Sequence, residues 1–232
     1  MSNTDLYLHE AILLLALRDE KGTIDASVHY SYAIAGAILA EFVLTNRVSI
    51  DASKRSQKVN PIDSTPFGDL ILDECLEKIR IKKKPDSAQN WVSRFSQIKG
   101  LKHRVAQQLV QRGILRMDED KILLMFKRKI YPEVNPEPER RIIAQMHEAI
   151  FSDSENIEPR ILVMIALAKA ADILKVVFDK KELKTRKKRL KQIEKGELVG
   201  IATKEAIEAM QAALAASAAI SASIAATAAA TS

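Results

Sequence analysis

The sequence contains one cysteine in 232 residues, Cys75, and this excludes an internal disulfide bond. The small extracellular domains that depend on disulfides are therefore excluded as a class, and a cytoplasmic protein is the simplest interpretation. Cys75 follows two acidic residues, Asp73 and Glu74, whereas a reactive thiolate needs a positive environment. We expect a small apolar side chain that is buried on one face of a helix.

The sequence also lacks a basic segment before its first apolar stretch. Residues 6–17 are apolar but are interrupted by His9 and Glu10, which a signal peptide would not contain. Their apolar positions recur at spacings of three and four, the period of an amphipathic helix. We expect a helix of the core here.

Glycine and proline are scarce, with seven of each, and aromatic residues make up only 5% of the chain. Residues that break helices are therefore few, and long stretches keep a helical period. Amphipathic helices are predicted around the core at residues 6–17, 69–81 and 139–151. Two more are predicted between these. One carries Trp91 and Phe95 and is capped by Asp86 or Ser87, and the other is basic and ends at Gly113. A short strand at 47–50 and a loop at 51–67 complete the first half.

Two further stretches, residues 28–44 and 160–178, are apolar almost all round, which is typical of helices buried in a core. Between them, the residues after Gly113 predict a short β-hairpin that turns at 117–120. The predicted fold class is therefore mainly α, a single globular domain over residues 1–204. Two buried central helices are ringed by amphipathic helices, with one short β-hairpin.

Residues 205–232 form an alanine-rich, low-complexity tail that has no charge after Glu208. The tail is long enough to span a bilayer, but its serine and threonine content and its few leucine and isoleucine residues oppose insertion. We expect a frayed helix or a disordered segment. Met210, Leu214, Ile220 and Ile224 give it a weak apolar stripe for a partner.

Motifs that carry catalysis or bind metal are missing. The four histidines lie in separate predicted elements, and none has a metal-ligand spacing to another histidine or to Cys75. His9 and His147 are expected at the edges of amphipathic helices. Glycine-rich phosphate loops and the GxSxG motif are absent too. The sequence therefore indicates a protein that is not an enzyme and that has no metal site and no cofactor.

Positive charge is concentrated between residues 99 and 132. The chain has 36 Lys and Arg against 30 Asp and Glu, a net charge of +6, which is only a moderate excess. Its placement is more informative, because cations precede and follow the predicted hairpin. The candidate site residues are Lys99, Lys102, Arg104, Lys127, Arg128 and Lys129. Such a surface attracts phosphate groups, in lipid or in nucleic acid.

A second basic segment spans residues 180–191, with eight lysines and arginines. On a helix these cations cover more than one face. A solvated helix is the simplest interpretation, and a dedicated phosphate-binding patch is the alternative.

Five blocks of the sequence, in collinear order, resemble the Golgi phosphoprotein 3 family. They are residues 6–18 (LYLHEAILLLALR), 68–74 (GDLILDE), 89–91 (QNW), 104–115 (RVAQQLVQRGIL) and the apolar helix 160–178. The resemblance extends over about residues 5–205 and is that of a bacterial-type or divergent member. It implies a mostly helical domain that lies peripherally on the cytosolic face of a membrane, at the Golgi only in a eukaryotic source.

The resemblance also implies partners and a site. Family members bind phosphatidylinositol 4-phosphate and the cytosolic tails of membrane proteins. Of the family's four lipid-binding positions, two fall on Lys99 and Lys102, so basic charge is kept there. The position of the family arginine falls on Ala35 and that of the tryptophan on Ala26. The expected lipid pocket is thus half present.

Three interpretations follow from the residues and the resemblance together. The first is a peripheral membrane adaptor that binds anionic lipid headgroups. The second is nucleic-acid binding through a winged-helix arrangement, and it ranks lower because the predicted basic helix uses its apolar face for the core and few side chains remain to read bases. The third is a scaffold that binds only proteins. The sequence leaves the oligomeric state open, including a homo-oligomer.

Overall fold

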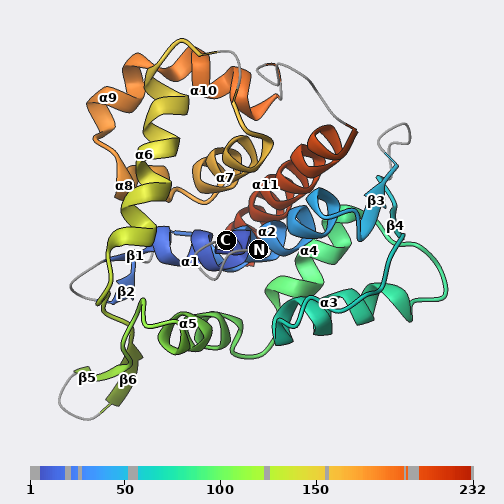
Figure 1. Cartoon of the computed structure of the whole chain (residues 1–232), viewed down its shortest axis with the longest axis horizontal. Coiled ribbons are helices and arrows are strands. Elements are labelled where there is room, and N and C mark those ends of the chain that lie inside the picture. Colours follow the sequence, from blue (N-terminus) through green and yellow to red (C-terminus); the bar gives the residue numbers. More distant parts are fainter. Residues whose placement is uncertain are drawn as a thin grey trace.

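A computed structural model describes residues 6–230 except 19–21, 26–27, 52–56, 123–125, 155–156, 196 and 198–203. Figure 1 shows helices gathered around a central group formed by α1, α2, α7 and α11. The helices are α1 Leu8–Ala16, α2 Tyr30–Leu44, α3 Leu70–Arg80, α4 Ala88–Ser96, α5 Leu101–Gln111, α6 Glu137–Phe151, α7 Pro159–Ala170, α8 Leu174–Val177, α9 Lys180–Thr185, α10 Lys187–Glu194 and α11 Lys204–Ala230. The predicted fold class, a mainly α domain, is confirmed.

The strands form three antiparallel pairs in the described part of the chain. Strand β1 (Leu17–Arg18) pairs with β2 (Thr23–Ile24), β3 (Val48–Ile50) with β4 (Val59–Pro61), and β5 (Asp118–Ile122) with β6 (Phe126–Ile130). The predicted strand at 47–50 is thus confirmed as β3. Its partner β4 falls in the stretch predicted as a loop.

The two helices predicted to be central are confirmed as buried. In α2 every residue from Ala33 to Val43 is buried, and in α7 every residue from Ile161 to Ala168 is buried. Cys75 and Trp91 also lie in the core, and burial, the largest effect, raises the pKa of the Cys75 thiol to about 12. Cys75 is therefore an apolar core residue and not a reactive thiol.

The expectation of a frayed or disordered tail is wrong for residues 204–230, which form the long helix α11. This helix packs against α2, α7 and α4, and its buried residues include Met210, Ala212, Ala216 and Ile220. The carboxylate of Glu208 accepts a hydrogen bond from the backbone N–H of Ile50 at 2.7 Å, which ties α11 to strand β3. The domain boundary at residue 204 stays a prediction.

Close packing explains how an alanine-rich helix becomes part of a core. A Cβ atom added to Gly36 of α2 would lie 2.7 Å from the Cβ of Ala216 and 2.8 Å from Cδ2 of Leu167. Only glycine fits at this crossing, where α2 meets α11 and α7. Small residues on both α2 and α11 let the two helix backbones approach closely, so the core is well packed without large side chains.

Helix α11 is also the one described helix that is long and apolar enough to cross a membrane by length and composition, over residues 208–227. Inside the fold 44% of this stretch is buried. Its apolar character is therefore used, at least in part, for contacts with α2, α4 and α7.

The helix predicted over residues 160–178 is interrupted after Ala170. Asp172 has a φ of 62°, the N–H of Ile173 donates to the carbonyl of Ala168, and the N–H of Asp172 donates to that of Lys169. These bonds form a Schellman motif, which ends a helix with one left-handed residue. The short helix α8 starts again at Leu174.

The predicted hairpin exists, but its strands begin and end elsewhere. The predicted turn at 117–120 lies mostly in strand β5, and the cations predicted behind the hairpin lie within strand β6. In the register, Glu119 is opposite Lys129 and Asp120 is opposite Arg128. Each of these cations therefore has an acidic residue across the ladder.

Candidate anion-binding surface around helix α5

Helix α5 places the cations that the sequence singles out. Gly100 precedes it with a φ of 68°, which glycine adopts without strain. One side of the helix enters the core through Leu101, Val105, Ala106 and Leu109. Successive residues on a helix are rotated by about 100°. Lys102 and Arg104 consequently lie on opposite sides of α5.

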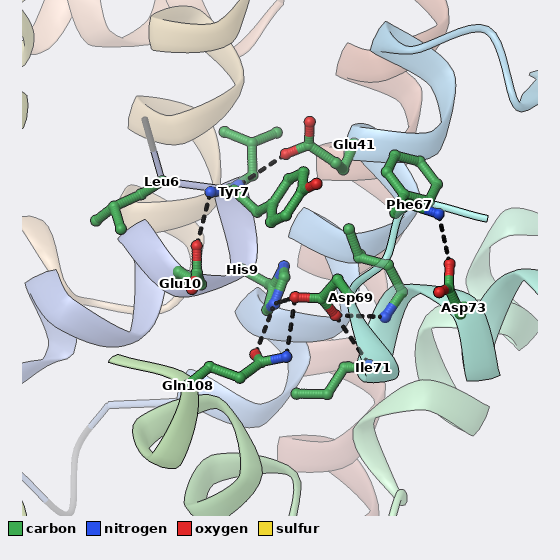
Figure 2. A network of polar contacts seen from close by, with 12 residues as sticks. Leu6, Tyr7, His9, Glu10, Glu41, Phe67, Asp69, Ile71, Asp73 and Gln108 are labelled. Atoms are coloured by element: carbon green, nitrogen blue, oxygen red, sulfur yellow. Dashed lines mark hydrogen bonds and ion pairs between the residues drawn. The ribbon is translucent and has the colours of Figure 1, made fainter. Parts of the chain in front are cut away.

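Buried polar contacts hold α5 against helices α1 and α3. Figure 2 shows Gln108 of α5 pointing at His9 and Asp69, and its amide donates to Asp69 Oδ2 at 2.9 Å. Asp69 Oδ1 in turn accepts from the N–H groups of Ile71 and Leu72 and so caps α3. Arg112 donates to the buried carboxylate of Glu10 at 2.7 Å. The orientation of α5 is therefore fixed by specific bonds as well as by apolar packing.

His9 is part of this network and is completely buried, so its prediction as an edge residue is wrong. Its Nε2 lies 3.4 Å from Gln108 Oε1 and 3.7 Å from Asp69 Oδ2. His147, in contrast, is exposed on α6 and packs its ring against Phe151 at 4.6 Å. The burial of His9 follows from the contact between α1 and α5, which the sequence pattern of α1 alone does not reveal.

Two of the candidate residues, Lys99 and Arg104, line a depression of about 660 Å³ between α3, α4 and α5. Three further cations that the sequence interpretation did not include, Lys78, Lys82 and Arg94, line it as well. The remaining lining residues are Glu74, Ile81, Trp91, Gln97 and Ile98. The depression thus combines five cations with one carboxylate.

Acidic residues neutralise part of this charge. Glu74 pairs with Arg104 at 2.6 Å and with Lys78 at 3.1 Å. Partial burial disfavours its ionised form, but the hydrogen bonds from Arg104 and Lys78 outweigh burial, so the pKa of Glu74 is lowered. Arg94 and Lys82 contact Asp86 at 3.1 and 3.5 Å. Lys99 makes no ion pair with any residue that the structure describes.

Lys102 lies on the other side of α5. Its Nζ is 6.0 Å from the ring centre of Tyr30, a cation–π contact, and its side chain is half-buried. Burial and the nearby charge of Arg128 both lower the pKa of Lys102. Within the described chain Lys102 has no acidic partner. The side chain is thus a poorly hydrated cation next to another cation.

The hairpin brings further positive charge to this side. The charge of Arg128 lowers the pKa of Lys102, and the charge of Lys129 lowers the pKa of the neighbouring His103. The side chain of Lys127 lies outside the described residues. The six candidate residues therefore do not converge on one point. Lys99 and Arg104 face the depression, whereas Lys102 faces Tyr30 and the charge of β6.

Two residues on the Lys102 side of α5, His103 and Tyr131, were not predicted from the sequence. Their side chains are joined by a hydrogen bond of 2.9 Å between Nδ1 and the hydroxyl group. Burial lowers the pKa of His103, and the charges of Lys102 and Lys129 lower it further. Burial also raises the pKa of Tyr131. A histidine directly after Lys102 is the only sequence signal that pointed here.

Comparison with known proteins shows the family to which the chain belongs. The model of one protein family, Golgi phosphoprotein 3 (GPP34), matches residues 8–210. The chain belongs to the Golgi phosphoprotein 3 family. It is also similar to vacuolar protein sorting-associated protein 74 of Eremothecium gossypii, with 29% identity over 146 residues. That match covers 55% of this chain and 44% of the relative, so the chain matches less than half of its length.

Membership in the Golgi phosphoprotein 3 family makes the departure at Ala35 informative. Ala35 is completely buried in α2 and so supplies neither charge nor a hydrogen bond where the family resemblance implies an arginine. The other departing position, Ala26, lies outside the described residues. At this position α2 therefore contributes no cation to the surface around α5.

Proposed function

We propose that this protein is a non-enzymatic, peripheral membrane adaptor that binds anionic phospholipid headgroups through the surface around α5. The observation that carries the proposal is Lys102, a half-buried ammonium group with a cationic neighbour and no acidic partner in the described chain. Partial burial and a neighbouring positive charge both disfavour the charged form of Lys102. A phosphate group between α5 and β6 would relieve this repulsion.

Membership in the family supports a phosphoinositide as the headgroup, and phosphatidylinositol 4-phosphate is the specific lipid we propose. Its phosphomonoester carries more charge than a phosphodiester and suits a cluster formed by Lys102, Arg128 and Lys129. Lysine lacks the planar fork with which arginine binds phosphate, and Ala35 removes a further contact. Discrimination between anionic lipids is therefore expected to be weak.

The proposed adaptor role adds protein partners at the same membrane. The curated relative is by its name a vacuolar protein sorting-associated protein, and a role in sorting supports the cytosolic tails of membrane proteins as partners. A basic surface with a few lipid contacts, each contributing ~1 kcal/mol, gives reversible attachment that salt weakens. Such attachment suits a protein that must reach its partners on the cytosolic face and then dissociate.

Vesicle binding tests the proposal. Replacing Lys102 and Lys129 by glutamate is expected to lower the partition coefficient on vesicles with phosphatidylinositol 4-phosphate by about 30-fold or more, since two contacts of ~1 kcal/mol are lost. Co-sedimentation at physiological salt measures the effect. Neutral vesicles and phosphatidylserine vesicles of matched charge give the lipid preference.

The matched control replaces Lys58 and Arg140 by glutamate, which changes the net charge equally at two exposed positions outside α5 and the hairpin. We expect this control to stay within about threefold of the wild type. An equal loss in both variants would reduce the effect to net charge. If the wild type pelleted with none of the vesicles, a scaffold that binds only proteins would replace the proposed adaptor.

The proton equilibrium of His103 reports on the same site. A bound anion close to Lys102 and Lys129 should raise the lowered pKa of His103, because a negative charge stabilises the imidazolium. Anion binding should consequently strengthen as the pH falls through the pKa of His103 in the complex. NMR titration of the histidine ring protons, with and without sulfate, measures the shift. A His103 curve that sulfate does not move would place the anion elsewhere, and His147 on α6 is the internal control.

A further inference from the structure

The basic segment at residues 180–191 divides in the structure into two kinds of cation. Arg186 binds the carbonyl of Phe151 and, at 3.0 Å, the carboxylate of Asp153. Arg189 donates to the carbonyl of Ala149 at 2.7 Å and also binds that of Ser154. Both arginines therefore attach α10 to the end of α6. Their role is structural.

The lysines of the same segment have no such role. Lys180, Lys181, Lys184, Lys187, Lys188 and Lys191 are all exposed, and none of these side chains has a hydrogen bond or an ion pair within the described residues. The position of these lysines relative to a groove divides them into two sets of three.

Three of them, Lys180, Lys184 and Lys187, line a groove of about 510 Å³ between α8, α9 and α10 and the end of α7. The apolar lining consists of Leu174, Leu183 and Leu190. Lys169 and Lys175 also line the groove, but they are paired with Glu194 and Asp172. Asp172 itself also lines the groove, which thus combines three leucines and three lysines that have no ion pair among the described residues with the Lys175–Asp172 pair.

We propose that this groove binds one molecule of an anionic lipid, with the acyl chain on the leucines and the headgroup at Lys180, Lys184 and Lys187. An apolar surface beside unpaired cations is complementary to an anionic amphiphile. Its volume lies in the range of small-molecule sites. Lysines, as flexible point charges, fit headgroups of varied geometry.

This site goes beyond the surface proposed around α5. Figure 1 places α9 and α10 at one end of the molecule and α5 with the hairpin at the other. The two sites share no residue. Because both sites would take an anionic lipid, the amide shifts of α9 and α10, and not total binding alone, distinguish the groove from the surface around α5.

A short-chain lipid that stays monomeric tests the groove without a membrane. Dihexanoyl phosphatidic acid is titrated into the full chain, and binding is measured by calorimetry and by amide NMR shifts. The groove variant carries Lys180→Gln, Lys184→Gln and Lys187→Gln. The matched control carries Lys181→Gln, Lys188→Gln and Lys191→Gln, which removes the same charge from the same helices outside the groove lining.

The groove variant should bind at least about tenfold more weakly, which is the loss of one or two headgroup contacts. The control should stay within about twofold of the wild type. Leu183→Asn, at a half-buried position, should also weaken binding while the helical circular dichroism is retained. Glycerol 3-phosphate, which has the headgroup without the chains, should bind at least about tenfold more weakly than the lipid.

Three results would overturn the proposal. An equal loss in groove variant and control would show attraction by net charge alone. Glycerol 3-phosphate binding as tightly as the lipid would remove the leucines from the site. An acidic peptide that shifts the groove amides while dihexanoyl phosphatidic acid does not would make the occupant a protein.

Discussion

Replacing Ala216 by leucine is expected to destabilise the protein by about 3 kcal/mol, because inserting carbon atoms into a tightly packed core forces the surrounding atoms to move. Ala216 is completely buried. A Cβ atom added to Gly36 would be only 2.7 Å from the Cβ of Ala216, so the space at this crossing is already filled. The added atoms of leucine would separate α11 from α2. Urea denaturation followed by circular dichroism measures the change in the free energy of unfolding.

Ala218→Leu is the matched control. It makes the same replacement two residues further along the same helix, at an exposed position. Leucine and alanine are both good helix formers, so this variant should stay within about 0.5 kcal/mol of the wild type. If neither variant changed the free energy of unfolding, α11 would not pack on α2, and residues 205–232 would be a tail outside the core.

The place of α11 shows where a composition argument fails. The few large apolar residues in residues 205–232 predict a frayed helix or a disordered segment with only a weak apolar stripe for a partner. Yet α2 carries small residues at its centre, among them Ala33, Gly36 and Ala40, and an alanine-rich helix fits against these. The packing of α11 was interpretable only together with α2. Complementarity between segments distant in sequence does not appear in the pattern of either one.

The ends of the helices show a related limit. The end of α5 was predicted correctly because Gly113 supplies a left-handed residue, here with a φ of 69°. The end of α7 was missed because Asp172, not glycine, takes the same position with a φ of 62°. Aspartate adopts this conformation less often, so its presence is a weak signal. The same Schellman motif was therefore predictable in one helix and not in the other.

The basic residues of the candidate site can be identified in the sequence, but their arrangement in space cannot. A basic helix beside a hairpin is visible in the sequence, and so is the loss of the family arginine at Ala35. The division of Lys99 and Lys102 between two sides of α5 depends on which face enters the core. The depression also receives Lys78 from α3, Lys82 from the residues after α3 and Arg94 from α4. Only the tertiary fold brings these three cations together.

Glu41→Gln tests a buried ion pair that no sequence pattern revealed. Glu41 is completely buried on α2 and binds Arg160 of α7 through both oxygens, at 3.0 and 2.7 Å. Its carboxylate also accepts from the N–H of Leu8 at 2.7 Å, and Arg160 donates to the carbonyl of Leu6 at 2.9 Å. One carboxylate therefore joins the start of α1 to both central helices.

The glutamine keeps the shape of Glu41 but removes the charge that Arg160 faces, so we expect a loss of roughly 2 to 4 kcal/mol. The loss should be at the lower end of the range for buried pairs, because the Arg160 side chain is 23% exposed and keeps some hydration. Glu77→Gln is the control, since Glu77 also binds an arginine, Arg80, through both oxygens at 2.6 Å, but on the surface of α3. Its midpoint of urea denaturation should match the wild type. Equal midpoints for all three proteins would mean that the Glu41–Arg160 pair does not hold α1, α2 and α7 together.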